Sequence, residues 1–390
     1  MNGRIVATVY RKELLELVRD RRTVISMVVV PIVAMPLLFS VMNYFMSSSE
    51  KKADEESTTI AVSGPLTMPG LEVALQSAGF QLKTTSDLRA AVSGKTAAAA
   101  LEEARAPGGN LQLRIYDDAT RPASEKAVGK LHEAFERLKD RQVRAALSSQ
   151  GIPEKVLEPF RVEDVDVAPQ GTKGKKFLGG MLGYMVILLM FTGCMYPAVD
   201  MTAGEKERRT LEILLASAAG RDEIVLGKIL AASTAAFTTA TLNIFSIAIS
   251  FQSGFLGKNL RELMAGTRIN GSAIALLLVA VLPTAITAAA VMITISSFAK
   301  SFKEGQSYLS PLIMLVVFPA VIGMMPGMEA SPRLALLPVF NVSQLIKSIF
   351  AGDYTAAAFL VSFASNFVYA AVAFAVAVRI FQREDVLFRT

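Results

Sequence analysis

The chain has 390 residues, of which 52% are hydrophobic and 19% charged, and its formal net charge is +6. Its one cysteine, Cys194, excludes a disulfide within the chain, and one cysteine with one histidine, His132, excludes a zinc site made by a single chain. Charges crowd some segments and are absent from long windows elsewhere. This uneven distribution is typical of a membrane protein that carries a polar domain.

Six windows that lack Asp, Glu, Lys, Arg and His are long enough to cross a bilayer, which takes about 20 apolar residues. They cover residues 24–49, 177–199, 229–257, 269–299, 305–328 and 354–378. A seventh window, 334–346, is about half a span long and contains Pro338 and Asn341. We therefore predict a polytopic α-helical membrane protein with six transmembrane helices. The first span covers 23–49, the other five lie in 177–390, and a re-entrant segment covers 330–350.

Among the short segments that flank the spans, lysine and arginine residues are concentrated in the N-terminal segment, in the connection after the second span and in the C-terminal tail. The positive-inside rule then places both termini in the cytoplasm and the long segment 50–176 outside. The first apolar window is too long for a signal peptide, and no Ala-x-Ala-like site follows it. We expect a multi-pass protein of a bacterial inner (plasma) membrane.

Segment 50–176 predicts an extracytoplasmic α/β domain. Short alternating or β-branched runs indicate strands, and helical spacing of apolar residues indicates helices. The expected strands are 58–63, 80–84, 111–116 and 160–167, and the expected helices are 69–79, 87–92 and 124–149. The domain shows no catalytic cluster, and His132 in the long charged helix reads as a solvated surface residue.

Residues 1–22 predict a cytoplasmic amphipathic helix. One face carries Ile5, Val6, Val9, Tyr10, Leu14, Leu17 and Val18. Such a helix can lie in the membrane interface and turn basic residues toward anionic headgroups. The basic residues in question are Arg11, Lys12, Arg19, Arg21 and Arg22. The alternative is a plain N-terminal helix that only follows the charge rule.

The cytoplasmic connection 200–228 contains a dense block of both charge signs followed by an apolar helical face. The block comprises Glu205, Lys206, Glu207, Arg208, Arg209, Thr210, Leu211, Glu212 and Leu215. It can form ion pairs with a soluble partner while Leu211, Leu214 and Leu215 fill a groove. The alternative is a solvated loop that only fixes orientation.

This block resembles the coupling region of ABC-2 type transporter permeases, especially the sodium-efflux (NatB-like) branch. Arg19-Asp20-Arg21-Arg22 before a span with Pro31, Gly227-Lys228 at the third span, and Leu337-Pro338 with Asn341 agree with that pattern. Two positions depart from it, because Arg209 stands where the family often has glycine and Ala218 where it often has proline. The resemblance implies a homodimer of six-span subunits bound to two separate soluble ABC ATPase subunits, which bind ATP and Mg, while this chain binds no cofactor.

The chain contains no G-x-x-x-x-G-K-[ST] phosphate-binding sequence, so we expect it not to be an enzyme on its own. The six windows hold no carboxylate, amine or imidazole, groups that ion-coupled transporters usually carry at mid-membrane. A sodium site would have to use amides and hydroxyls, for which the candidates on the substrate path are Asn243, Asn366, Thr192 and Thr294. The alternative is that these groups bond their own helix or a neighbour.

The sequence therefore predicts the non-catalytic permease subunit of an ATP-driven exporter of sodium ions or of a hydrophobic or amphipathic compound. Its expected partners are the ATPase, a second copy of itself and the lipid bilayer, with no nucleic acid. A different class stays open, namely a membrane receptor or scaffold with a ligand-binding extracytoplasmic domain. Glycine pairs at 179/183 and 323/327 permit close helix packing, and Cys194 is expected to be a buried apolar residue.

Overall fold

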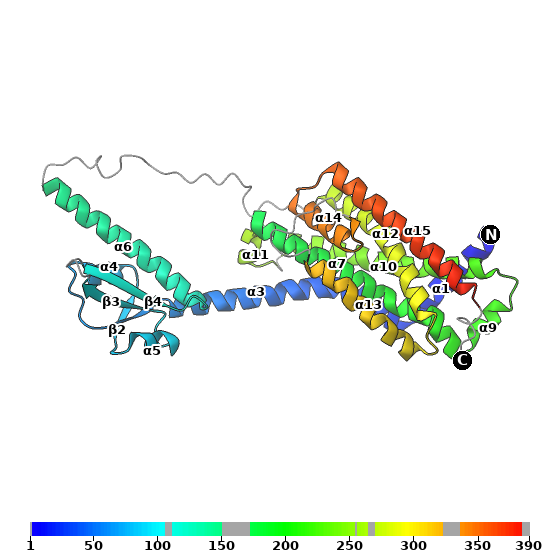
Figure 1. Ribbon diagram of the computed structural model, residues 1–390, viewed down its shortest axis with the longest axis horizontal. Helices are drawn as coiled ribbons and strands as arrows, with labels where there is room; N and C mark the ends of the chain where they lie inside the picture. The colour runs from blue at the N-terminus through cyan, green and yellow to red at the C-terminus, as the bar shows by residue number, and fades with distance from the viewer. Residues whose placement is uncertain are drawn as a thin grey trace. The chain divides into compact units, whose positions relative to one another are not determined.

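The computed structural model describes residues 2–105, 111–149, 172–253, 256–263, 270–322 and 336–383 (Figure 1). The chain forms two compact units. The first, here called the membrane unit, comprises Met1–Asn43 and Ala168–Thr390, and the second, the α/β unit, comprises Tyr44–Val167.

The α/β unit is built on a four-stranded sheet in the order β2-β1-β3-β4. Its strands are β1 (Thr59–Val62), β2 (Gln81–Thr84), β3 (Ala99–Arg105) and β4 (Leu111–Asp117). Strand β1 is parallel to β2 and β3, whereas β4 is antiparallel to β3. Its helices are α4 (Leu71–Ser77), α5 (Leu88–Ser93) and α6 (Pro122–Ser149).

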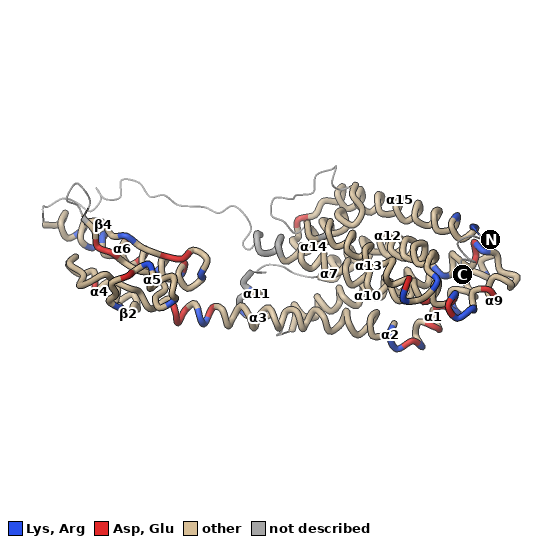
Figure 2. The backbone as a smooth tube through the Cα atoms, turned by 60° about the horizontal axis from the view of Figure 1, so that its bottom comes forward, with Lys and Arg blue, Asp and Glu red and all other residues tan. Residues whose placement is uncertain are grey.

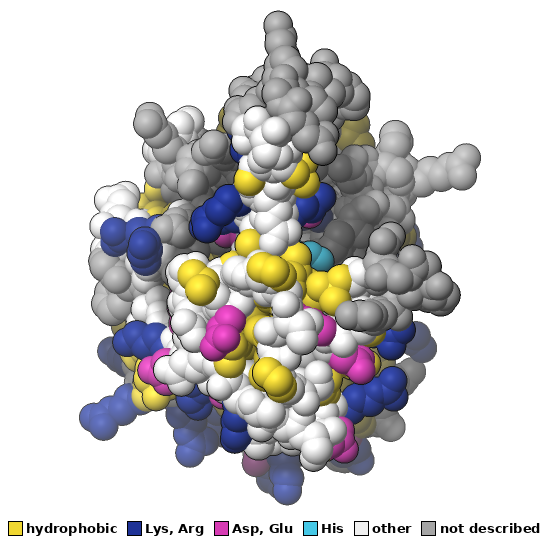
Figure 3. Space-filling model, turned by 90° about the vertical axis from the view of Figure 1, so that its left-hand side faces the viewer, with side chains coloured by type: hydrophobic (Ala, Val, Ile, Leu, Met, Phe, Trp, Pro, Cys, Tyr) yellow, Lys and Arg dark blue, Asp and Glu magenta, His cyan; other side chains and the backbone are white. Residues whose placement is uncertain are grey.

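Successive residues of β1 and β3 face opposite sides of this sheet, so each strand contributes to two clusters. Ile60 and Leu101 pack with α4 and α6 on one face, and Ala61 and Ala100 pack with α5 on the other. His132 is exposed, as predicted, and the histidine is visible at the surface in Figure 3. The α/β unit therefore has a hydrophobic core of its own.

Strand β3 was not predicted from the sequence. Residues 97–104 read Ala-Ala-Ala-Ala-Leu-Glu-Glu-Ala, and alanine, leucine and glutamate all favour helix. Tertiary packing overrides that preference, because Ala98–Leu101 are completely buried between helices on both faces. The other described elements of this unit match their predicted ranges to within a few residues, and the predicted strand 160–167 lies outside the described residues.

The membrane unit is helical throughout its described residues. Its elements up to the second connection are α1 (Gly3–Arg19), α2 (Arg21–Val24), the π-helix η1 (Ile25–Val29), α3 (Val30–Glu56), α7 (Thr172–Val199), the π-helix η3 (Asp200–Gly204), α8 (Glu205–Glu207) and α9 (Thr210–Leu215). They are followed by α10 (Arg221–Gln252), α11 (Lys258–Leu263), α12 (Gly271–Ser296), α13 (Phe302–Ile322), α14 (Phe340–Ala351) and α15 (Ala356–Phe381).

Within the described residues, five helical segments are long and apolar enough to cross a membrane. They are Arg21–Glu56, Leu178–Glu207, Arg221–Gln252, Gly271–Ser296 and Ala356–Phe381. These coincide with five of the six predicted windows. Helix α13 occupies the remaining window as far as Ile322 but is not one of the five, and residues 323–328 lie outside the described residues. The sixth span therefore stays a prediction.

Helix α14 lies within the predicted re-entrant segment and is only 12 residues long. It packs directly on α7, because a Cβ at Gly179 or Gly183 would come within 3.1 Å of the carbonyl oxygen of Lys347 or Ser343. The small-xxx-small spacing of these two glycines is thus a helix contact within the chain. The pair Gly323/Gly327 lies outside the described residues.

Candidate functional site

The connection between α7 and α10 is the part of the membrane unit where charged side chains enter the interior. We call residues 200–215 the coupling segment; it comprises η3, α8 and α9. Figure 2 shows lysine, arginine, aspartate and glutamate gathered at the end of the membrane unit that carries α1, α2 and α9. Arg209 separates α8 from α9 with a left-handed backbone (φ 59°), which turns the chain between the two short helices.

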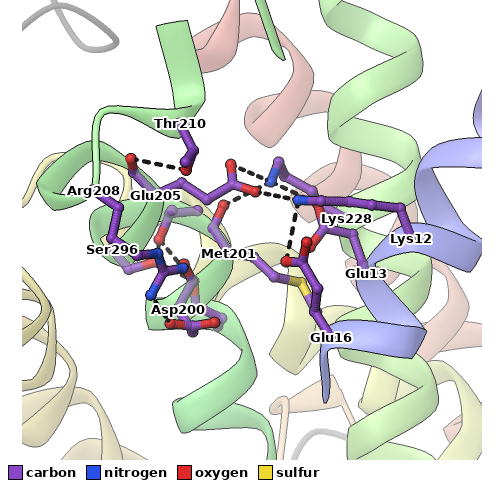
Figure 4. Close-up of polar contacts among 12 residues, drawn as sticks. Lys12, Glu13, Glu16, Asp200, Met201, Glu205, Arg208, Thr210, Lys228 and Ser296 are labelled. Carbon is purple, nitrogen blue, oxygen red and sulfur yellow. Dashed lines mark hydrogen bonds and ion pairs between the residues drawn. The ribbon is translucent and has the colours of Figure 1, made fainter. Parts of the chain in front are cut away.

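Lys228, in the second turn of α10, is completely buried. Its Nζ donates to Glu13 Oε1 at 2.8 Å, to Glu205 Oε2 at 2.6 Å and to the carbonyl oxygen of Met201 at 2.8 Å (Figure 4). An ammonium has three donors, so all of them are used. Met201 belongs to the π-helix η3, whose irregular backbone supplies this acceptor.

Lys12 of α1 approaches the same carboxylates from the solvent side. Its Nζ lies 2.6 Å from Glu205 Oε1 and 3.2 Å from an oxygen of each of Glu13 and Glu16. Burial alone would lower the pKa of Lys12, but attraction by the Glu13 and Glu205 carboxylates outweighs it, and the pKa lies above its ordinary value. We call Lys12, Glu13, Glu16, Glu205 and Lys228 the ion cluster.

The ion cluster joins three elements that are far apart in the sequence. Glu13 and Lys12 come from α1, Glu205 from α8 and Lys228 from α10. Glu13 and Glu205 are almost fully buried, so removing one partner would leave an uncompensated charge away from water. The cluster therefore fastens α1 and the coupling segment to α10.

Apolar and neutral contacts reinforce this attachment along α1. A Cβ at Gly227 of α10 would come 2.7 Å from Val9 Cγ1, so glycine is required for this close approach. The hydroxyls of Tyr10 and Thr234 are 3.1 Å apart. The backbone N–H of Asn2 donates to Glu223, which also accepts from the N–H of Gly220 and so caps α10.

The coupling segment is also bonded to the helices that follow α10. Lys206 donates to the carbonyl oxygen of Ser297, and Thr202 Oγ1 donates to Ser296 Oγ at 2.7 Å. The N–H of Phe302, at the start of α13, donates to Glu207 Oε2 at 2.7 Å. Movement of the coupling segment would therefore act directly on α10, α12 and α13.

A groove of about 730 Å³ opens between the end of α1 and the coupling segment. Its lining includes Lys12, Glu16, Arg19, Arg208, Ile213 and Leu214. It thus offers both charge signs beside an apolar strip. Of the predicted apolar contacts, Leu211 is buried in the membrane unit, whereas Leu214 and Leu215 are half-buried. Ile213, which was not among them, is 73% exposed.

The structure divides the predicted coupling residues into two groups. Glu205 and Leu211 are buried and fasten the segment together with the half-buried Lys206 and Leu215, whereas Glu207, Arg208, Arg209, Thr210 and Glu212 are exposed. Arg11 and Arg19 on α1 and Arg21 and Arg22 on α2 are exposed, and Lys12 belongs to the ion cluster. The predicted apolar face is corrected in part, because Val6, Val9 and Leu17 are buried in the chain while Val18 is 67% exposed.

Three of the four residues proposed for a substrate path bond their own helix. Thr192 donates to Leu188, Thr294 to Ala290 and Asn366 to Ser362, all through carbonyl oxygens within 2.8 Å. Asn243 differs, because it is completely buried and neither its Oδ1 nor its Nδ2 has a partner in the described part of the chain. Of these four residues, Asn243 is therefore the one whose side-chain oxygen and nitrogen could bind another group.

Sequence reasoning missed the pairing of Glu13 with Lys228. Glu13 follows Val9 by four residues and precedes Leu17 by four, which places a carboxylate in the buried stripe of α1. Lys228 lies within the first turns of a spanning helix. A carboxylate on an apolar stripe and a lysine at the start of a span are signals from which the pair could have been inferred.

The long apolar helices, with a charged segment fastened to their ends, define a polytopic membrane protein. The sequence model of the ABC-2 family transporter proteins matches residues 7–386, so the chain belongs to this family. It is also 24% identical over 358 residues to the ABC transporter permease protein NatB of Bacillus subtilis (strain 168). That alignment covers 89% of this chain and 90% of the relative, and the predicted resemblance is confirmed.

Proposed function

We propose that this chain is the membrane-spanning subunit of an ATP-driven exporter and that the coupling segment, with the end of α1, docks a separate soluble ATPase subunit. The observation that carries the proposal is the combination of an ion cluster, in which Glu13, Glu205 and Lys228 are buried, with an open groove. The cluster fixes the segment to α10, and the groove presents charge and apolar surface to a partner.

In this proposal, closure of two ATPase subunits on ATP and Mg pushes on the coupling segments of a homodimer. Six spans per subunit, cytoplasmic termini, an extracytoplasmic α/β unit and a location in the bacterial plasma membrane complete the arrangement. The exposed face of α1, with Arg11 and Arg19 beside Leu15 and Val18, lies toward anionic headgroups, as does Arg22 of α2. Family membership over nearly the whole chain removes support from the receptor or scaffold alternative.

We propose an exported sodium ion or a hydrophobic or amphipathic compound as the substrate. The buried, unpartnered amide of Asn243 favours a polar contact within the helix bundle, since an amide oxygen can replace part of the water around a cation. The apolar surroundings of the spans suit the other class of compound. ATPase activity of a candidate partner, measured with this protein in lipid nanodiscs against sodium, potassium and a series of hydrophobic compounds, separates the two.

Docking is tested by reversing one exposed charge on α9. Glu212→Lys should abolish co-purification of the ATPase while membrane insertion is retained. Glu207 is less suitable for this purpose, because its carboxylate also caps the first turn of α13. Glu72→Lys, an equal charge reversal at an exposed position of the α/β unit, is the matched control. Unchanged co-purification with Glu212→Lys would refute this docking surface.

A further inference from the structure

The first span contains two prolines, Pro31 and Pro36, in a helix that continues from η1 through α3. Proline has no N–H and cannot donate to the carbonyl oxygen four residues before it. Four residues before these prolines stand Met27 and Ile32, whose carbonyl groups lose this donor. In the π-helix η1 the N–H of Val30 donates five residues back to Ile25, so Pro31 also removes the corresponding donor to Ser26. Inside a bilayer no water is available to replace such a bond, so another donor is needed.

Helix α10 supplies a hydroxyl donor to each of the Met27 and Ile32 carbonyl groups. Thr239 Oγ1 lies 3.2 Å from the oxygen of Met27, and Ser246 Oγ lies 2.7 Å from the oxygen of Ile32. The donors are seven residues apart, which places them two turns apart on one face of α10. Thr239 also lies 2.9 Å from the oxygen of Ala235, so its single hydrogen is shared.

The surroundings of Thr239 are shaped around its side chain. A Cβ at position 193 of α7 would lie only 2.3 Å from Thr239 Oγ1. The threonine side chain therefore fits against α7 only because residue 193 is glycine. Farther along the contact between α3 and α10, the rings of Phe39 and Phe251 pack edge to face with their centroids 6.0 Å apart. We call the contacts of Thr239, Ser246 and Phe251 with the first span the α10 seam.

In the described part of the chain, much of the surface of the first span is exposed. Only 17% of its apolar window is buried, and Val33 and Leu37 are more than half exposed. The side chains of Met35 and Phe39 are buried, and the hydroxyl bonds lie next to them along the helix. The α10 seam is therefore a principal contact that sets where this span lies.

We propose that Thr239 and Ser246 are positioning residues for transport, because they dock the first span on α10 through the two carbonyl groups that its prolines release. The docking follows from geometry alone, whereas its effect on transport rests on the proposed function. The same helix carries two internal controls. The hydroxyls of Ser233 and Thr241 are buried and have no partner in the described residues.

The test uses the full chain in lipid nanodiscs and reads the midpoint of thermal unfolding. Thr239→Val and Ser246→Ala should each lower the midpoint by about 1–2 °C. The matched changes Thr241→Val and Ser233→Ala should not lower it, because they remove hydroxyls for which the described part of the chain offers no partner. Equal effects of test and control substitutions would overturn the proposal.

Repeating these substitutions in chains that lack one of the two prolines distinguishes hydrogen bonding from packing. In a Pro31→Ala chain the restored N–H can bond Met27, so Thr239→Val should no longer lower the midpoint. Pro36→Ala should cancel the effect of Ser246→Ala in the same way. If each hydroxyl substitution has the same effect with proline and with alanine, the proline-released carbonyl groups are not the acceptors, and the proposal fails.

A spectroscopic readout remains informative if a midpoint cannot be measured. Spin labels at Val33 and Ile249, both more than half exposed, report the separation of the two helices. The double variant Thr239→Val/Ser246→Ala should broaden their distance distribution, and an unchanged distribution would contradict docking.

With the ATPase present, the double variant should lose substrate transport per ATP hydrolysed. If the double variant broadens the distance distribution but transports as well as the wild-type chain, the role in transport is overturned while the docking of the first span still stands. Failure to find any ATPase partner would bear on the proposed function and not on the α10 seam.

Discussion

The α/β unit and the coupling segment both lie between consecutive spanning helices, and both are rich in charge, yet they are stabilised differently. The α/β unit buries Ile60, Leu101 and Leu131 in a core of its own and leaves most of its charges on the surface. The coupling segment is too short for a core, and it is held by buried charges that belong partly to α1 and α10.

This difference indicates which of the two segments can transmit movement. The α/β unit is stabilised by a hydrophobic core made of its own residues. A segment whose carboxylate is bonded to a lysine inside a spanning helix cannot move without that helix. Substitutions in the ion cluster and substitutions in the core of the α/β unit should therefore affect function differently.

The largest expected effect is at the buried lysine. Lys228→Met leaves Glu13 and Glu205 buried with only Lys12 nearby, and we expect a loss of about 3–5 kcal/mol in stability of the membrane unit. The measurement is the thermal midpoint and the monodisperse fraction in detergent. The triple variant Glu13→Leu/Glu205→Leu/Lys228→Met removes the three buried charges together and should recover much of the loss. A fully stable single variant would contradict the ion cluster.

An effect of similar size is expected in the α/β unit but with a different functional outcome. Leu131 is completely buried, and Leu131→Ala should destabilise this unit by about 2–5 kcal/mol. Hydrogen exchange should rise in β1 and β3 of the full chain and stay unchanged in α10. Co-purification of the ATPase should be retained, and its loss would show that the two segments are not independent.

The smallest effect concerns the turn between α8 and α9. Arg209 has a left-handed backbone, which costs a residue with a Cβ about 1–2 kcal/mol. Arg209→Gly should therefore raise stability by about 1 kcal/mol. Arg209→Ala also removes the charge but keeps the Cβ, so it should give no gain. Equal midpoints for the glycine and alanine variants would mean that the turn is not strained.

The turn at Arg209 also shows what a sequence can reveal. The resemblance to the ABC-2 permeases pointed to a position where glycine is usual, and the structure has a positive φ there. The apolar windows likewise predicted five of the spanning helices, because about 20 apolar residues in a row leave few alternatives.

Other features depend on contacts between distant segments and could not be read locally. Strand β3 is composed of helix-favouring residues and is a strand only because helices cover both of its faces. Glu205 was correctly placed in the coupling block, but its role changed once Lys228 and Lys12 were found beside it. The donors to the proline-released carbonyl groups lie more than 200 positions away in sequence.

The central claim is that the coupling segment, and not the α/β unit, contacts the ATPase. Site-specific photo-crosslinking in native membranes tests it most directly, from Ile213 of α9 and from Val73 of α4, which are 73% and 66% exposed. The account predicts a product with a soluble Walker-motif ATPase, identified by mass spectrometry, from position 213 and none from position 73. No ATPase product from 213, or an equal one from 73, would contradict it.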